Sequence, residues 1–205
     1  ETPWPIEWEI VHQTDTYQIA MTKQIIDLRC FDAKESTNPN SDRKKYGNNN
    51  WQYSNIEQFL NSDQANWYSA QHSYDAPPTN DNIYFGYNTG LGYNTGYDTH
   101  KGFLYYFSDE EKSLLKDMTL ILANNNKTDG GGSYTWTGKV FLPTHTQMCG
   151  DGNGSNNSNL INEGTKFDKY SDNNSRIKTI NKYCAENNPY CKANNKTEGT
   201  IEWYW

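Results

Sequence analysis

The sequence predicts an α+β domain in which a compact aromatic core carries long ordered loops. Aromatic residues make up 15% of the 205 residues, although hydrophobic residues of all kinds make up only 34%. Each buried ring removes a large apolar area from water, so a ring-rich core is expected. Strand-like alternation is interspersed with helix-capping sequences. Asn occurs in runs such as 48–50 and 124–126, and because Asn favours turns, these runs predict ordered loops.

Strands are predicted where apolar and polar residues alternate, or where a short apolar run stands between turn residues. The segment Ile6–Val11 shows the clearest alternation. The predicted strands are 6–11, 17–21, 24–31, 118–123, 139–142 and 201–205. A polar loop is expected over 32–50.

Two helix starts are predicted by capping boxes, in which a Ser side chain and a Glu three residues later each accept a backbone N–H. Ser54 with Glu57 begins the first helix, and Ser108 with Glu111 begins the second. A third helix is expected over 176–186. From the first two helices, the side chains expected to face the core are Phe59, Leu60, Leu114 and Leu115. Ile177, Ile180 and Cys184 are expected to share one face of the third helix.

Charge and hydropathy exclude two classes of partner. The net charge is -7, and Arg43-Lys44-Lys45 is the most basic cluster, so binding to nucleic acid, which needs a basic surface, is not expected. No stretch approaches the roughly 20 apolar residues of a membrane span, so membrane insertion is not expected. The chain begins at Glu1 rather than Met, and we expect it to be a fragment or a processed product.

Four cysteines, Cys30, Cys149, Cys184 and Cys191, allow two disulfides in three connectivities. Cys184 and Cys191 are the two that lie close in sequence, and one bridge between them would close a short loop. Buried thiols are an equally good interpretation. The close Cys spacing of zinc sites is absent from the sequence.

A calcium loop is suggested by oxygen donors at alternate positions, Asp151, Asn153 and Ser155. However, Asn156 stands where the sharp turn of such a loop needs Gly, and Asn162 stands where a bidentate Glu is needed. A hydrated turn therefore fits better, and no cofactor is expected.

The best candidate for ligand binding is the Tyr- and Asn-rich segment 74–102, in which Tyr-Asn-Thr-Gly occurs twice. Long loops in compact domains are often functional. Exposed rings beside amides suit sugars, which present C–H faces and hydroxyl rims, and they also suit protein surfaces. The alternative is that the rings pack this loop onto the sheet. The candidate residues are Tyr87, Asn88, Tyr93, Asn94, Tyr97 and Asp98.

Four sequence blocks resemble, in order, those of an uncharacterised domain family common in phage tail proteins. The blocks are Pro3–His12, Trp51–Asn61, Phe107–Lys112 and Lys139–Leu142. That family is similar to C-type-lectin-like and formylglycine-generating-enzyme-like folds. The resemblance implies a single lectin-like domain over 1–205, with a small twisted antiparallel sheet. Trp203–Trp205 resembles the start of a further family segment, so we expect the domain to be truncated at its C-terminus.

The leading hypothesis for function is a non-enzymatic binding or display domain of a phage tail fibre or receptor-binding protein. Its partners would be a bacterial surface glycan or protein and other virion tail proteins, and it would be located on the virion tail or outside the cell. The alternatives are a bacterial cell-surface adhesin or carbohydrate-binding module, and an architectural subunit that forms homo-oligomers. No enzyme is expected, because the acidic residues show no paired-carboxylate motif and His145 and Cys149 lack an orienting third group.

Overall fold

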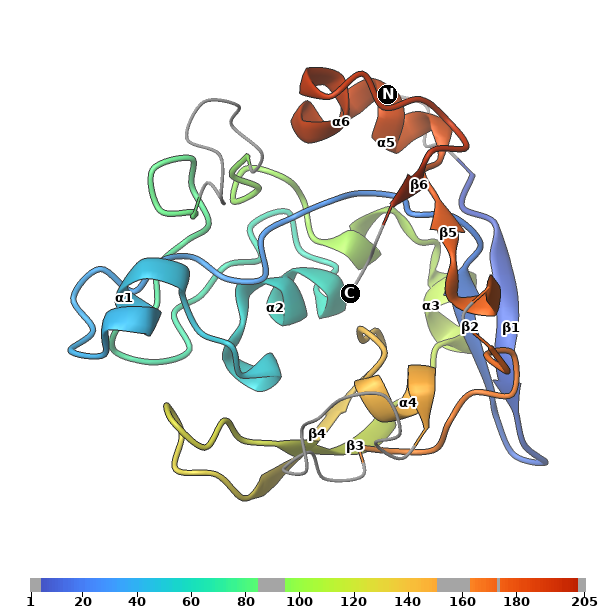
Figure 1. Ribbon diagram of the computed structural model, residues 1–205, viewed down its shortest axis with the longest axis horizontal. Coiled ribbons are helices and arrows are strands. Elements are labelled where there is room, and N and C mark those ends of the chain that lie inside the picture. Colours follow the sequence, from blue (N-terminus) through green and yellow to red (C-terminus); the bar gives the residue numbers. More distant parts are fainter. Residues whose placement is uncertain (1–4, 85–94, 151–162, 173, 203–205) are drawn as a thin grey trace. The chain divides into compact units, whose positions relative to one another are not determined.

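The computed structural model describes residues 5–84, 95–150, 163–172 and 174–202. The chain forms two compact units, with unit 1 comprising Glu1–Leu28 and Leu142–Trp205, and unit 2 comprising Arg29–Phe141. Within the described residues, the helices are short and the strands form three separate two-stranded antiparallel sheets (Figure 1). The protein is therefore of the mixed α and β type that the sequence predicts. A single domain over 1–205 stays a prediction.

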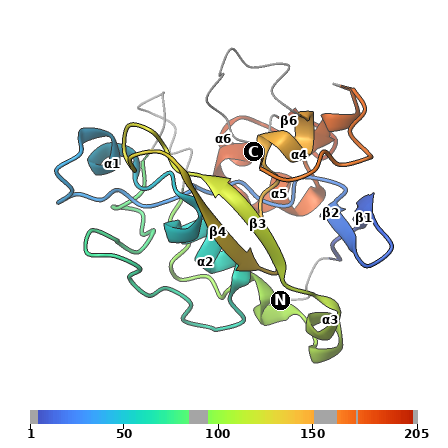
Figure 2. The same cartoon turned by 90° about the horizontal axis from the view of Figure 1, so that it is seen from below.

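Unit 2 contains most of the helices and one β-hairpin. Its elements in chain order are α1 (Ser41–Tyr46), η1 (Trp51–Tyr53), α2 (Asn55–Asn61), η2 (Phe103–Tyr106), α3 (Asp109–Leu114), β3 (Met118–Ala123) and β4 (Ser133–Gly138). Figure 2 shows the β3–β4 hairpin as a long twisted ribbon that crosses α2. The Nε1 of Trp136 in β4 donates to the carboxylate of Glu57 in α2 at 3.0 Å, which ties the hairpin to the helix.

Unit 1 contains the other two sheets and a helical corner. Its elements in chain order are β1 (Trp8–Gln13), β2 (Gln18–Thr22), α4 (His145–Cys149), η3 (Asn174–Arg176), β5 (Lys178–Thr179), α5 (Lys182–Asn187), α6 (Pro189–Ala193) and β6 (Ile201–Glu202). β1 pairs with β2, with a bulge between Ile10 and His12, and β5 pairs with β6. Of the predicted strand 24–31, Ile25 alone makes a β-bridge, with Ile180.

The two helix starts predicted from Ser54 and Ser108 are confirmed, but the side chains of the second helix do not face the core as predicted. Ser108 and Glu111 form the reciprocal capping box of α3. Ser54 caps α2, but its own N–H donates to the carbonyl of Trp51, so this box is only half formed. Leu114, expected in the core, is 77% exposed because it is the last residue of a six-residue helix.

The predicted strand 139–142 is wrong, and a side chain explains why. The backbone N–H groups of Lys139 and Val140 both donate to Oδ1 of Asn61 at 3.0 Å. Nδ2 of Asn61 donates to the carbonyl of Val140 at 2.8 Å. The amide of Asn61 therefore satisfies backbone groups that would otherwise pair with a strand. β3 pairs instead with β4 (Ser133–Gly138), a segment for which the sequence predicted no strand.

The predicted helix 176–186 is also partly wrong. Lys178 and Thr179 form β5, and the helix α5 begins only at Lys182. The side chain of Asn181 accepts the N–H of Cys184 at 2.8 Å, which caps the helix at this point. Ile177 is consequently exposed rather than buried.

Replacement of Asn61 by Ala tests the role of its amide. The variant leaves two backbone N–H groups and one carbonyl without this partner, so we expect the free energy of unfolding to fall by about 2–3 kcal/mol in urea titrations. Asn187→Ala, which removes one hydrogen bond at an exposed helical position, is the control and should cost less than about 1 kcal/mol. Equal losses in the two variants would contradict this role.

Candidate functional site

The structure describes two of the six predicted ligand-binding residues. Tyr97 is fully buried, and its hydroxyl donates to the carbonyl of Cys30 at 3.1 Å. Its ring stacks on Trp67, with centroids 5.6 Å apart, and meets Phe59 edge-on. Tyr97 therefore packs in the core of unit 2 and does not present its ring to a ligand.

Of the other predicted ligand-binding and calcium-binding residues, Asp98 is the one that the structure describes. Asp98 is partly exposed in a turn. The remaining candidates lie outside the described residues, namely Tyr87, Asn88, Tyr93, Asn94 and the calcium candidates Asp151, Asn153 and Ser155. Among the residues that the structure describes, no group of three or more His, Cys, Asp and Glu side chains is placed to hold a metal ion.

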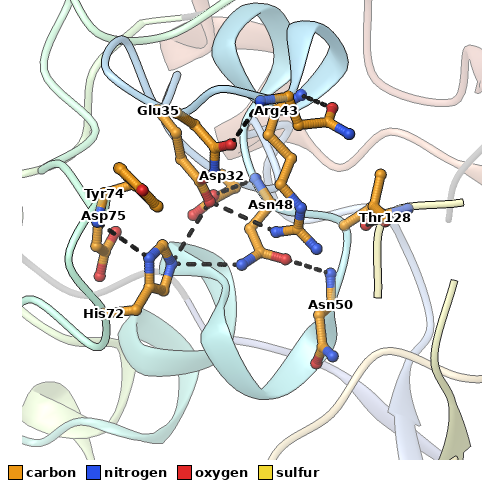
Figure 3. Close-up of polar contacts among 12 residues, drawn as sticks. Asp32, Glu35, Arg43, Asn48, Asn50, His72, Tyr74, Asp75 and Thr128 are labelled. Carbon is orange, nitrogen blue, oxygen red and sulfur yellow. Dashed lines mark hydrogen bonds and ion pairs between the residues drawn. The ribbon is translucent and has the colours of Figure 1, made fainter. Parts of the chain in front are cut away.

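A polar cluster in unit 2, which the sequence analysis did not identify, joins several of its loops (Figure 3). We use the name "polar cluster" for Asp32, Glu35, Arg43, Asn48, Asn55, His72 and Asp75. Asp32 and Glu35 lie in the segment before α1, Arg43 lies in α1, and Asn48 lies between α1 and η1. Asn55 is the first residue of α2, and His72 and Asp75 lie in the loop that follows α2. Most of them are buried, so their polar groups need partners within the protein.

Asp32 is the centre of the polar cluster and is 2% exposed. Its Oδ2 accepts the backbone N–H of Asn48 at 2.5 Å, and its Oδ1 accepts that of Asn55 at 2.9 Å. The side chain of Asn55 accepts the N–H of Ala33 and donates to Asp75. One carboxyl group therefore fixes the turn before η1 and the first turn of α2 against the segment that carries Asp32.

Burial controls the protonation of Asp32. Removal of the carboxyl from water raises its pKa to about 7, although the N–H groups of Asn48 and Asn55 favour the charged form and act in the opposite direction. The nearby charges of Asp75 and Glu35 raise the pKa further.

Glu35 and Arg43 form the charged part of the polar cluster. Oε1 of Glu35 lies 3.5 Å from Nη1 of Arg43 and 3.5 Å from Nε2 of His72. Arg43 also forms an ion pair with Asp129, which lies between β3 and β4. Glu35 is only 1% exposed, so its carboxyl group depends on Arg43 and His72 as partners within the protein. The pairs connect α1 with the tip of the hairpin.

Asn side chains fix the backbone of the segment 40–52 by accepting backbone N–H groups. Oδ1 of Asn48 accepts the N–H of Asn50 at 2.8 Å, and Oδ1 of Asn50 accepts that of Gln52 at 3.2 Å. Asn40 caps α1 in the same way. These contacts are Asx turns, in which a side chain replaces a backbone partner two residues away. They are the local order that the Asn runs predict.

At the surface, the polar cluster is bordered by rings. We use the name "aromatic edge" for Tyr53, His72 and Tyr74. The rings of Tyr53 and His72 meet edge-on, with centroids 5.9 Å apart. Nδ1 of His72 lies 3.4 Å from the backbone N of Tyr74, and Nδ2 of Asn48 lies 3.3 Å from its Nε2. Tyr53 is 40% and Tyr74 38% exposed. His72 therefore contacts the ring of Tyr53 and the backbone of Tyr74 on one side, and Glu35 and Asn48 on the other.

The arrangement suits the holding of loops better than acid–base chemistry. Both oxygens of Asp32 are occupied by backbone N–H groups, and Glu35 is buried behind its ion pairs. A catalytic acid or base must reach the proton that it transfers. His72, whose side chain is 23% exposed, and Asp75 are the partly exposed members of the cluster.

Local sequence signals do not reveal the polar cluster. Asp32 and Asp75 are 43 positions apart in the printed sequence, and neither belongs to a motif. The one available signal was the spacing of Asn48 and Asn50, which is typical of consecutive Asx turns.

The fold and the site together define a mixed α and β domain whose loops are fixed by buried polar side chains. A family model described as "Domain of unknown function (DUF6273)" matches residues 18–205. The chain belongs to this family. It matches no curated protein and no solved structure. Of the helices that the structure describes, none is long and apolar enough to cross a membrane.

The raised pKa of Asp32 predicts a specific pH dependence of stability. Because the folded protein keeps this proton up to about pH 7 and the unfolded chain releases it near the ordinary value of 3.8, the folded state binds more protons in this window. Stability from Asp32 is therefore fully present below about pH 4 and is lost as the pH rises through 7. Asp32→Asn lacks this titration.

The measurement is the free energy of unfolding of wild type and Asp32→Asn across the pH range. The difference, wild type minus variant, should fall by up to roughly 4 kcal/mol between pH 4 and pH 8. Parallel pH profiles would contradict a raised pKa for Asp32.

Gly47 gives a second prediction, because it lies where the chain turns next to Asp32. Its φ is +85°, and a Cβ atom would lie 2.2 Å from the carbonyl oxygen of Ala33 and 2.9 Å from Oδ2 of Asp32. Gly199 has the same φ and no atom within 4 Å of an added Cβ, so it is a matched control. Gly47→Ala should destabilise the fold by at least about 2 kcal/mol more than Gly199→Ala, as measured by urea unfolding. Similar effects would show that the Ala33 contact relaxes easily.

Proposed function

We propose that this chain is a non-enzymatic binding domain that presents the aromatic edge to a partner on a bacterial surface. The observation that carries the proposal is the combination of two exposed Tyr rings with a buried polar cluster directly behind them. Tyr53 belongs to η1, and Tyr74 belongs to the loop after α2. The ring of Tyr53 meets that of His72 edge-on, and the backbone N of Tyr74 lies 3.4 Å from Nδ1 of His72. His72 is itself held beside Glu35 and Asn48.

This combination favours binding because the loops are ordered before a ligand arrives. Rings on mobile loops lose conformational entropy when they bind, whereas rings on a fixed backbone lose little. The segment that carries Tyr53 begins with Asx turns at Asn48 and Asn50. The segment that carries Tyr74 is tied by Asp75, which accepts the N–H of Gln71 at 2.8 Å and a bond from Asn55 at 3.3 Å.

The chemistry of the aromatic edge favours a glycan as the ligand. Tyr rings stack on the C–H faces of sugars, and their hydroxyl groups form hydrogen bonds with the rim. A net charge of -7 disfavours polyanionic ligands. A protein surface is the second candidate, because exposed Tyr residues are common contact residues in protein recognition.

The resemblance of the sequence to phage tail domains supports a finer proposal, in which the domain has a lectin-like fold. It would serve on a phage tail fibre or receptor-binding protein and recognise a bacterial surface glycan. The virion would then be its location, and other tail proteins would be its neighbours.

The glycan proposal is tested with the complete protein on an array of bacterial surface glycans, followed by calorimetry on the best ligand. We expect Tyr53→Ala/Tyr74→Ala to bind roughly ten- to thirty-fold more weakly, because each ring contributes about 1 kcal/mol. The control is Tyr106→Ala, which removes a ring that is 63% exposed in η2 and should leave binding unchanged.

Two outcomes would contradict the proposal. One is that the complete protein binds no glycan and no protein from bacterial envelopes. The other is that the double variant, with an unchanged melting temperature, binds as tightly as the wild type. Isolation of the protein without any association with virions would contradict the finer proposal alone.

A further inference from the structure

Two cysteine side chains face each other in the helical corner of unit 1. Cys184 lies in α5 and Cys191 in α6, and the two short helices are joined at Asn188, as the corner drawn in red in Figure 1 shows. Their sulfur atoms lie 3.6 Å apart, and both residues are fully buried. They form an apolar cluster with Ile25 and Ile180.

Hydrogen bonds fix the backbone on both sides of this pair. The side chain of Asn181 accepts the N–H of Cys184, and the N–H of Asn188 donates to the carbonyl of Cys184 at 2.9 Å. The N–H of Lys196 donates to the carbonyl of Cys191 at 2.8 Å. The side chain of Asn188 also donates to the carbonyl of Leu28 at 2.8 Å. The fold therefore holds the two sulfur atoms within hydrogen-bonding distance of each other.

We propose that Cys184 and Cys191 form a disulfide bond when the chain folds in an oxidising compartment. A disulfide has a sulfur–sulfur distance of about 2.05 Å, so the two sulfur atoms need to approach by about 1.5 Å. The proposal requires that rotation about the two Cα–Cβ bonds, with at most small shifts of the short helices, provides this movement. The proposal is independent of the aromatic edge and of the function proposed for it.

The reaction needs an oxidant, which we take to be a small-molecule or protein disulfide of the compartment. The thiolate of one cysteine attacks this disulfide, forms a mixed disulfide and releases one thiolate of the oxidant. The thiolate of the second cysteine then displaces the other oxidant sulfur and forms the internal bond. Two protons and two electrons leave the protein, and the oxidant becomes two thiols.

Burial determines when this exchange occurs. With both side chains at 0% exposure, an oxidant reaches them only before the corner has folded or after it has opened locally. The bond therefore forms during folding and afterwards resists reductants in the native state. It would join helices of six and five residues, which are too short to be stable alone.

Cys30 provides a contrast within the same chain. It is buried in unit 2, and burial raises its pKa to about 12. Cys149 is partly exposed at the end of α4.

The proposal is tested by refolding the full chain with a mixture of oxidised and reduced glutathione, followed by mass spectrometry of the intact protein and its peptides. We expect a mass loss of about 2 Da, which corresponds to two hydrogen atoms, and a cross-linked peptide that contains Cys184 and Cys191. Cys30→Ala/Cys149→Ala should keep the bond, and Cys184→Ala/Cys191→Ala should lose it. The bridged protein should melt several degrees higher than the reduced protein.

Alkylation of both Cys184 and Cys191 in the refolded protein, after unfolding without reductant, would overturn the proposal. A cross-link from either cysteine to Cys30 or Cys149 would also overturn it. Peptide mapping of the wild type decides the question if the Cys184→Ala/Cys191→Ala variant does not fold. Because this test does not involve ligand binding, its failure would leave the proposed function unaffected.

Discussion

A buried carboxyl group that accepts two backbone N–H groups joins the loops of unit 2, and much of that unit depends on it. Asp32 connects Asn48 in the turn before η1 with Asn55 at the start of α2. Loops carry polar backbone groups that must be satisfied when they are covered, and unit 2 has little regular structure to satisfy them. Side-chain groups take that role here. The partial positive charge at the start of α2 adds to the attraction for the carboxyl oxygen.

The use of side chains to satisfy loop backbone groups explains how so polar a sequence forms a folded structure. Rings share the buried core with aliphatic side chains, with Tyr97 stacked on Trp67 and Trp51 edge-on to Trp136. Asn, Asp and Ser then hold the intervening segments in place through specific hydrogen bonds. Such polar networks favour one conformation, and in this one Oε1 of Glu35 has ion contacts with Arg43 and His72 in place of a hydrogen bond. A surface ring on such a segment, such as Tyr53, is therefore held ready for contact at low entropic cost.

The sequence predicted what is local and missed what depends on contacts distant in sequence. The apolar run that forms β3 and the capping box of α3 are local signals, and both were confirmed. The segment 139–142 has the same apolar character, but the amide of Asn61 takes its hydrogen bonds. Tyr97 was predicted to bind a ligand, because no local pattern distinguishes a ring that packs from one that is displayed. The polar cluster was missed for a related reason, since its members become neighbours only in the folded chain.

The measurement that most directly tests the central role of Asp32 is native-state hydrogen exchange of individual backbone amides, read by NMR. If the carboxyl of Asp32 holds these loops, the amides of Asn48 and Asn55 should exchange as slowly as those inside α2, and both should become faster together in Asp32→Ala. Exchange of the Asn48 amide at the rate of an exposed loop in the wild type would contradict the account. The turn would then be ordered by something other than the shared carboxyl.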